Sequence, residues 1–356
     1  MRSKRIIITV ALIIVVAILA VFALQARKNQ TKSAAPKVAA ISFAGQDEVV
    51  RGAVDWMVSE FQNDDGGYAS FSGGANQAPS AIAETLDVVL ALAAAGHDPA
   101  MTFDGQESSP LVFLRANGEA LASYAQVDGG QAGKVVLALT AASVDPRDFA
   151  GQDYVALITK QYDQAGGFGA GDTFKQANAM LGLAAAGEPI PAPAIDWLES
   201  KQAADGSWDD GFGTASNADA TAIAIMALLA AGRTSADASI QSAKAFLSSS
   251  QQPAGWEYGP GFGPNANSTS LVIQALSGLG EDWYSDASPW TKDGQTALQA
   301  LLAFRGTSGA FQSDFGQGPF DDFYATVQAI PTVAGQWLPL SVKFDTAHLI
   351  LFWLGI

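Results

Sequence analysis

The sequence of 356 residues predicts an all-α protein built from repeated pairs of helices. A pattern of similar segments recurs about every 44–56 residues, which leaves room for two helices and two connectors. The second helix of each pair is rich in alanine and apolar nearly all round. Alternation of β-branched residues, which is typical of strands, is almost absent. These three observations favour a helical repeat protein over any sheet-containing class.

The first helix of each pair ends in a glutamine and a glycine turn that an aromatic residue closes. Residues 53–57 (AVDWM) recur as 194–198 (AIDWL), and the turns that follow are residues 62–68 and 202–208. Looser copies of the turn occupy residues 161–168, 251–256 and 305–311, and residues 113–124 resemble a degenerate sixth copy. The first helix carries charge, as at Glu199 and Lys201, so we expect one of its faces to be wet.

The second helix of each pair is predicted to be buried on every side. Its clearest copies are residues 221–228, before Gly232, and residues 269–276, before Gly280. An amphipathic helix that alternates with a fully apolar one suits two concentric rings with the alanine-rich helices inside. We expect six pairs closing on themselves over residues 43–356. An open superhelix of helix pairs is the alternative.

The amino terminus is predicted to be a membrane anchor. Residues 1–5 are basic, and the 19 residues 6–24 are apolar apart from Thr9. At about 1.5 Å per residue such a helix nearly spans a bilayer core of roughly 30 Å. We therefore expect a cytoplasmic tail (1–5), a single-pass transmembrane signal anchor (6–24), a tether (25–42) and an extracytoplasmic body at the cell membrane. Secretion after cleavage of a signal peptide is the alternative.

Composition excludes several classes of function. Residues 41–356 hold 12 basic and 35 acidic side chains, a net charge of −23, so nucleic acid is not an expected partner. The chain has no cysteine, which removes disulfides and thiolate sites, and its two histidines, His97 and His348, cannot form a histidine-rich metal cluster. We expect no metal and no cofactor. The apolar stretch 346–356 has no assigned role.

The turn at Gln202, Gly206 and Trp208 is similar to the QW repeat of squalene–hopene cyclases and oxidosqualene cyclases. The repeated helix pair also resembles the α/α toroid of prenyltransferases and of cobalamin-carrier domains, over about residues 45–340. This resemblance to the terpenoid cyclase/prenyltransferase superfamily implies an α6/α6 toroid. If the protein is an enzyme, it implies terpenoid cyclase or prenyltransferase-like chemistry, although the zinc site of protein prenyltransferases needs a cysteine.

The acid motif of the cyclases is degenerate in this chain. Their catalytic acid lies in an Asp-x-Asp-Asp-Thr-Ala motif that opens an inner helix, and residues 217–222 here read Asn-Ala-Asp-Ala-Thr-Ala. The resemblance implies Asp219 as the acid, with Asn217 and Ala220 in place of the two flanking carboxyl groups. Because alkene protonation needs a strong and well-supported acid, whether catalysis remains is open.

The amino ends of the inner helices predict a ligand site. Parallel inner helices gather these ends at one mouth, where each contributes unpaired N–H groups. The candidate ligand-binding residues at the helix starts and in the glycine–aromatic connectors before them are Asn217, Asp219, Asn265, Asn267, Asp321, Asp322, Phe212 and Phe262. Asn and Asp are also the preferred N-caps, so each of them can instead serve its own helix.

Other candidates have structural alternatives. Glu84 is an acid in an apolar inner helix that could face the cavity, and Lys134 or Lys175 could pair with it. We predict that the acidic segments 63–65 and 205–211 are solvated turns and not calcium loops, because they lack the spacing of calcium ligands. For Trp208 and Trp256 we favour packing between helices over ligand contact.

Three functions fit these patterns. The first is a membrane-anchored toroid that binds a small-molecule, isoprenoid or glycan ligand at the inner-helix mouth without cyclase activity. The second is a small terpenoid cyclase or mutase with Asp219 as the acid. The third is a carbohydrate-active enzyme in which Asp219 and Asp321 form an acid/base pair about 5–9.5 Å apart.

Overall fold

The computed structural model describes residues 43–344, with gaps at 71–72, 164, 166, 169–170, 212–214 and 343. The chain divides into a unit of residues 1–40 and a compact unit of residues 41–356, and the described residues belong to the second. The predicted tail, anchor and tether lie outside the described residues, as do Phe212, His348 and the stretch 346–356. None of the helices that the structure describes is long and apolar enough to cross a membrane.

Two sets of helices make up the described part of the chain. The first set is α3 (Ile82–Ala94), α6 (Gly129–Ala141), α8 (Thr173–Ala185), α10 (Ala218–Ala230), α12 (Ala266–Gly278) and α14 (Phe323–Val333). The second set is α2 (Gln46–Phe61), α4 (Pro110–Ala116), α5 (Gly118–Ala125), α7 (Tyr154–Lys160), α9 (Ala192–Ser200), α11 (Ala238–Ser250) and α13 (Ala297–Leu302). Two short antiparallel hairpins complete it: β1 (Thr291–Lys292) pairs with β2 (Gln295–Thr296), and β3 (Gln312–Ser313) with β4 (Phe320–Asp321).

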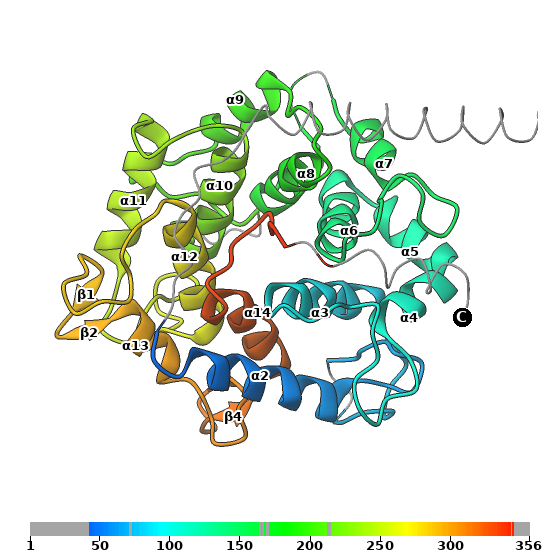
Figure 1. The fold of residues 1–356 in the computed structure, drawn as a ribbon. Helices are drawn as coiled ribbons and strands as arrows, with labels where there is room; N and C mark the ends of the chain where they lie inside the picture. Colours follow the sequence, from blue (N-terminus) through cyan, green and yellow to red (C-terminus); the bar gives the residue numbers. More distant parts are fainter. Residues whose placement is uncertain are drawn as a thin grey trace, which may run out of the picture. The chain divides into compact units, whose positions relative to one another are not determined.

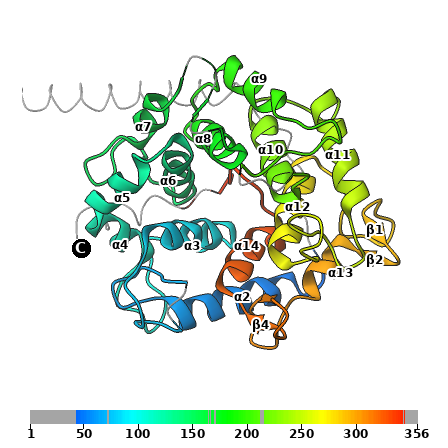
Figure 2. The same ribbon diagram turned by 180° about the vertical axis from the view of Figure 1, so that it is seen from behind.

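The first set of helices forms a closed inner ring. Going round it, α3 packs on α6, α6 on α8, α8 on α10, α10 on α12, α12 on α14, and α14 returns to α3. The second set lies outside this ring (Figures 1 and 2). The prediction of an all-α toroid is confirmed for the described residues, and the open superhelix is wrong because the last inner helix contacts the first. The expectation of a degenerate sixth turn at residues 113–124 was wrong, because this segment is helical: α4 and α5 meet there at Asn117.

Small residues let the inner helices approach closely. A Cβ built on Gly133 of α6 would lie 2.2 Å from the backbone oxygen of Asn178 in α8, and one built on Gly182 of α8 would lie 2.7 Å from Gly133 Cα. Helix α10 is buried at ten of its positions, from Ala218 to Leu228. An alanine- and glycine-rich sequence is therefore what permits a ring this narrow.

A repeated clamp joins each turn to the inner helix that follows it. The backbone N–H of the turn aromatic donates to a threonine hydroxyl in four repeats, over 2.9–3.1 Å: Tyr68 to Thr85, Trp208 to Thr221, Trp256 to Thr269 and Phe311 to Thr326. The Gln202 amide donates to the oxygens of Gly206 and Ser239, so it ties its turn to the next outer helix.

Trp208 and Trp256 are packing residues, as predicted. Both are fully buried, and their indole N–H groups donate to the carbonyls of Leu198 and Leu247 at the ends of the outer helices. Buried indoles with satisfied N–H groups stabilise the junction between outer helix, turn and inner helix.

A segment after α14 crosses the ring. Trp337 lies against Gly278 at the carboxyl end of α12, and the Phe344 N–H donates to the Ser143 hydroxyl just beyond the end of α6. The red trace in Figure 1 follows this path across the middle of the ring. Because Gly278 and Ser143 both lie at carboxyl ends of inner helices, the crossing is at the face opposite the inner-helix starts.

Candidate ligand-binding site

A cavity of about 560 Å³ opens where α10, α12 and α14 begin. Sites for small molecules usually measure roughly 300–1,000 Å³, so its size suits one organic ligand. The residues that line it are Asp219, Tyr258, Phe262, Pro264, Asn265, Asn267, Ser268, Ala303, Phe304, Gln312, Ser313, Asp314, Phe315, Pro319, Asp322 and Tyr324. Three inner-helix starts thus contribute to one cavity, as the repeat predicted.

Aromatic rings supply much of its wall and its rim. Tyr258 and Phe262 meet edge to face with ring centroids 5.6 Å apart. Phe262 is 70% exposed and Phe315 is 79% exposed, although both are large and apolar. Exposed phenylalanines grouped at the edge of a cavity mark a surface that gains free energy when apolar material covers it. The cavity is therefore suited to an apolar ligand.

Asp219 lies in the first turn of α10 and is one of the residues that line this cavity. Its Oδ1 atom is buried and has no hydrogen-bond partner among the described residues. Burial raises the pKa of Asp219 to about 6; the nearby Ser268 hydroxyl lowers it in part, and the charge of Asp210 adds to the rise. Ser268 Oγ, too, is buried and lacks a partner with hydrogen-bond geometry in this part of the chain. The Ser268 hydroxyl is therefore the donor that lies nearby for the Asp219 carboxyl group within the described residues.

Asp210 is a residue that sequence reasoning missed. It is fully buried in the turn after Trp208 and accepts a hydrogen bond from the Tyr258 hydroxyl. Its position was predicted only as part of an acidic, solvated turn. No local signal identifies it, because its partner Tyr258 lies 48 residues later in the next repeat.

The N-cap interpretation is confirmed at three helix starts. The side-chain oxygens of Asn217, Asn265 and Asp322 accept from the backbone N–H three residues on, at 2.7–2.8 Å. Asn265 and Asp322 also line the cavity, whereas Asn217 is fully buried and is not among the lining residues. A cap and a cavity residue can thus be the same side chain.

The remaining candidates divide between the cavity and its surroundings. Asn267 lines the cavity and donates to the Gln328 side chain over 3.1 Å. Phe262 forms the rim. Asp321 is not among the lining residues, and its Oδ1 accepts from the Gln312 amide at 2.8 Å. Phe212 lies outside the described residues.

The partners expected for Glu84 were wrong. Its Oε1 accepts from the hydroxyls of Ser70 and Tyr324 at 3.0 and 3.1 Å, so it joins the start of α3 to that of α14. Lys134 pairs instead with Asp87 at 2.7 Å, and Lys175 lies 3.6 and 3.8 Å from carboxylates of its own neighbourhood, Asp128 and Asp172. Glu84 contacts α14 in the first turn of α3, whereas Asp87, three residues later, contacts α6, which carries Lys134.

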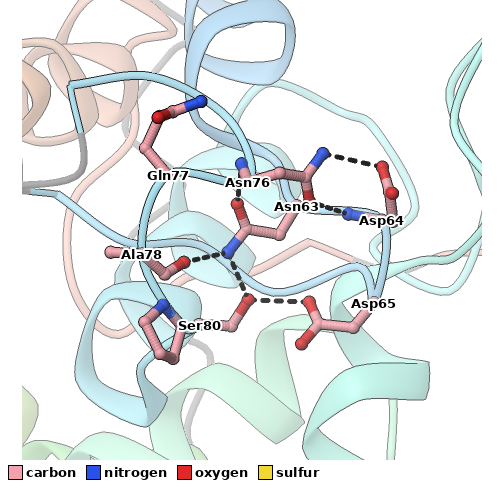
Figure 3. A pocket seen from close by; sticks show the side chains of 8 residues that line it. Asn63, Asp64, Asp65, Asn76, Gln77, Ala78 and Ser80 are labelled. Carbon is pink, nitrogen blue, oxygen red and sulfur yellow. Dashed lines mark hydrogen bonds between the residues drawn. The ribbon is translucent and has the colours of Figure 1, made fainter.

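A second hollow, of about 460 Å³, lies between the acidic turn at 63–65 and residues 76–80. Figure 3 shows that its polar groups bind one another. Asn76 donates to Asp64 at 2.8 Å, and the Ser80 hydroxyl donates to Asp65 at 2.7 Å. Within the described residues, no group of three or more His, Cys, Asp or Glu side chains could hold a metal ion. The solvated-turn interpretation fits this hydrogen bonding better than a calcium loop.

Comparison with known proteins supports the fold. No sequence profile of a protein family matches this chain, and no match is found among curated proteins. The type II terpene cyclase MstE from Scytonema superposes with a TM-score of 0.56 at 14% identity, over 82% of this chain and 98% of that one. An inactive variant of an α-1,6-mannanase from Salegentibacter gives a TM-score of 0.52 at 11% identity, over 82% and 98%. The chain therefore has the α/α-toroid fold, as the QW-like repeat predicted.

Proposed function

We propose that the cavity at the starts of α10, α12 and α14 binds an apolar, isoprenoid-like ligand, and that Asp219 is the polar group that anchors it. The observation that carries this proposal is that Asp219, an acidic residue in the first turn of α10, lines a cavity that is walled by aromatic rings. The apolar part of a ligand gains about 25 cal/mol for each Å² that it buries against such rings. Its hydroxyl or amine would satisfy Asp219.

The toroid fold supports an isoprenoid ligand without assigning a reaction. One structure of MstE holds geranylgeranyl dihydroxybenzoate, its substrate, so this fold accommodates a geranylgeranyl chain in that protein. We infer from the aromatic lining of the present cavity that a chain of the same kind fits here. Because the likeness is one of fold, the nature of the headgroup must come from the residues of this cavity.

Acid catalysis is the second candidate, and Asp219 is the specific observation that favours it. The carboxyl proton would pass to an alkene carbon, the aromatic faces would stabilise the resulting cation, and a later proton loss would restore the acid. Alkene protonation needs a strong acid, yet burial and Asp210 both raise the pKa of Asp219 and so weaken it. We therefore favour binding over cyclisation.

The carbohydrate-active alternative is less well supported. The mannanase variant carries asparagine in place of two consecutive aspartates, and this chain has three such pairs, of which Asp321 and Asp322 include the expected partner of Asp219. Here Asp322 caps α14 and Asp321 is held by Gln312 outside the cavity lining. Neither carboxyl is thereby free to act as the partner of Asp219.

Equilibrium binding of geranylgeraniol tests the proposal. The full chain is placed in phospholipid nanodiscs, and empty nanodiscs measure how much of the ligand enters the lipid. We expect saturable binding that weakens about 5- to 10-fold in Asp219→Leu, because one hydrogen bond of roughly 1–1.5 kcal/mol is lost. The control, Asp196→Leu on the outer surface of α9, should bind like the wild type.

The recovered ligand decides between the two candidates. Unchanged geranylgeraniol is expected by mass spectrometry. Conversion to a cyclic product that Asp219→Asn abolishes would establish the enzyme instead, and absence of saturable binding would reject both readings.

We also propose that residues 6–24 hold the toroid at the cell membrane, outside the cytoplasm. The support is the length and apolarity of this segment. Two arginines within it, Leu12→Arg and Val15→Arg, should move the full chain from the carbonate-resistant membrane fraction to the supernatant. A wild-type chain already found in the supernatant would contradict the anchor.

A further inference from the structure

We infer that this cavity selects apolar ligands that carry no anionic headgroup, so that long-chain alcohols, hydrocarbons and amines fit and prenyl diphosphates do not. The inference rests on the proposed function and names its ligand class. Among the sixteen described residues that line the cavity there is no lysine, arginine or histidine. Three lining residues, Asp219, Asp314 and Asp322, are acidic, and Asp210 lies beside them with Tyr258 as its donor.

Among the described residues that line the cavity, the positive contribution comes from the helix dipoles, and it is outweighed. The starts of α10, α12 and α14 each carry about half a positive charge, about 1.5 in all. Some of their amide groups are engaged: Asn217, Asn265 and Asp322 accept from the third N–H of each helix, and the Ala218 N–H donates to the Tyr258 carbonyl. Four carboxyl groups therefore face a smaller and partly satisfied positive charge.

Basic side chains near the other inner-helix starts have partners of their own. Lys175, at the start of α8, lies between Asp128 and Asp172, and Lys134 is paired with Asp87. Beyond these pairs, residues 41–356 carry a net charge of −23. An anionic headgroup would thus meet repulsion both on approach and at the cavity, and its desolvation would find no compensating cation.

This charge pattern distinguishes the cavity from a site for an anionic isoprenoid. A diphosphate needs arginine, lysine or a metal ion to replace its water. The ligand in the MstE complex is itself a benzoate, so a geranylgeranyl chain alone does not define which headgroup a toroid accepts. In the present chain, aromatic faces beside carboxylates suit an uncharged or positively charged group.

Three ligands with one chain and different headgroups test the inference. Geranylgeraniol, geranylgeranylamine and geranylgeranyl diphosphate are titrated against the full chain in zwitterionic nanodiscs at about 0.05 M salt. We expect the diphosphate to bind at least tenfold more weakly than the alcohol, and the amine to bind at least as tightly as the alcohol. The difference should shrink at about 1 M salt, where the Debye length falls to roughly 3 Å.

A charge-switch variant makes the test specific to the cavity. Asn267→Lys adds a cation at the lining, and we expect it to raise the affinity for the diphosphate at least tenfold relative to the affinity for the alcohol. Gln241→Lys adds the same charge to the exposed side of α11 and should leave both unchanged.

The outcomes distinguish this inference from the proposed function. A diphosphate that binds the wild type as tightly as the alcohol would overturn the headgroup inference and leave the isoprenoid site standing. Absence of saturable binding by all three ligands would instead overturn the proposed function. A diphosphate affinity that rises equally in Gln241→Lys would show long-range attraction and not recognition in the cavity, which also contradicts the inference.

Discussion

The second residue of each inner helix differs from the cap that precedes it. The caps of α10, α12 and α14 are Asn217, Asn265 and Asp322, which are similar and serve the backbone. Two residues after each cap stand Asp219, Asn267 and Tyr324, and all three line the cavity. The capping position is thus set by local hydrogen bonding, whereas the residue two positions on varies in type and lines the cavity in all three helices.

Asp219 makes the stability of the protein depend on pH. Its pKa in the folded chain, about 6, lies above its ordinary value of 3.8, so its contribution to stability is fully present below about pH 4 and is lost as pH rises through 6. The free energy of unfolding of Asp219→Asn should exceed that of the wild type by up to about 3 kcal/mol at pH 7.5. At pH 4 the two free energies of unfolding should be similar. Urea denaturation at the two pH values measures this. A difference that is the same at both would contradict the assigned pKa.

The affinity for an alcohol ligand should also depend on the ionisation of Asp219. An alcohol can donate to ionised Asp219, so its affinity should be retained or increase between pH 5 and 7.5. Isothermal titration of geranylgeraniol at these two pH values measures the change. A steep loss of binding as pH rises would show that the ligand needs the protonated acid, and would favour the catalytic candidate.

Helix contacts explain which glycines the ring requires. Gly129, Gly130 and Gly133 of α6 all face α8 or the turn before it, and a Cβ at any of them would lie within 2.5 Å of a neighbouring atom. The sequence predicted small residues inside the ring but not which pair of helices would approach most closely. That depends on the angle at which two helices cross, which local sequence does not encode.

Gly133→Ala should destabilise the toroid by about 1–3 kcal/mol or more, because the added methyl meets the backbone of α8 and cannot be accommodated by a rotamer change. Gly52→Ala in α2 is the matched control, since its Cβ would meet the flexible end of Arg305 and gains helix propensity of roughly 1 kcal/mol. Urea unfolding followed by circular dichroism compares them. Equal effects of the two substitutions would contradict the close α6–α8 contact.

At the scale of the whole molecule, ring closure joins the first and last repeats. The Gln46 amide of α2 donates to the Val333 carbonyl of α14 over 2.8 Å, and the Tyr324 hydroxyl donates to Glu84 of α3. These contacts link residues more than 200 positions apart. A closed ring has no free end at which unfolding can begin, in contrast to an open solenoid.

Tyr324→Phe should therefore loosen both sides of this junction together. It removes the hydroxyl that Ser70 and Glu84 contact, at a cost of about 1–2 kcal/mol, and hydrogen exchange should rise in α3 as well as in α14. Tyr284→Phe, at a half-exposed outer position, is the control. Faster exchange confined to α14 would show that the ring does not transmit the loss.

The repeat, the two helix types, the caps and the acidity of the body were all predictable from the sequence, because each depends on residues close together in the chain. Asp219, Asn265, Asn267, Asp322 and Phe262 were predicted and lie at the cavity. The roles of Asp210, Phe304 and Tyr324 at the cavity could not be predicted from the sequence, because their contacts join separate repeats. The same reason applies to the hydrogen-bond partners of Glu84. The carboxyl groups of Asp219, Asp314 and Asp322 likewise line one cavity, with Asp210 beside them, because α12 packs between α10 and α14 in the tertiary structure.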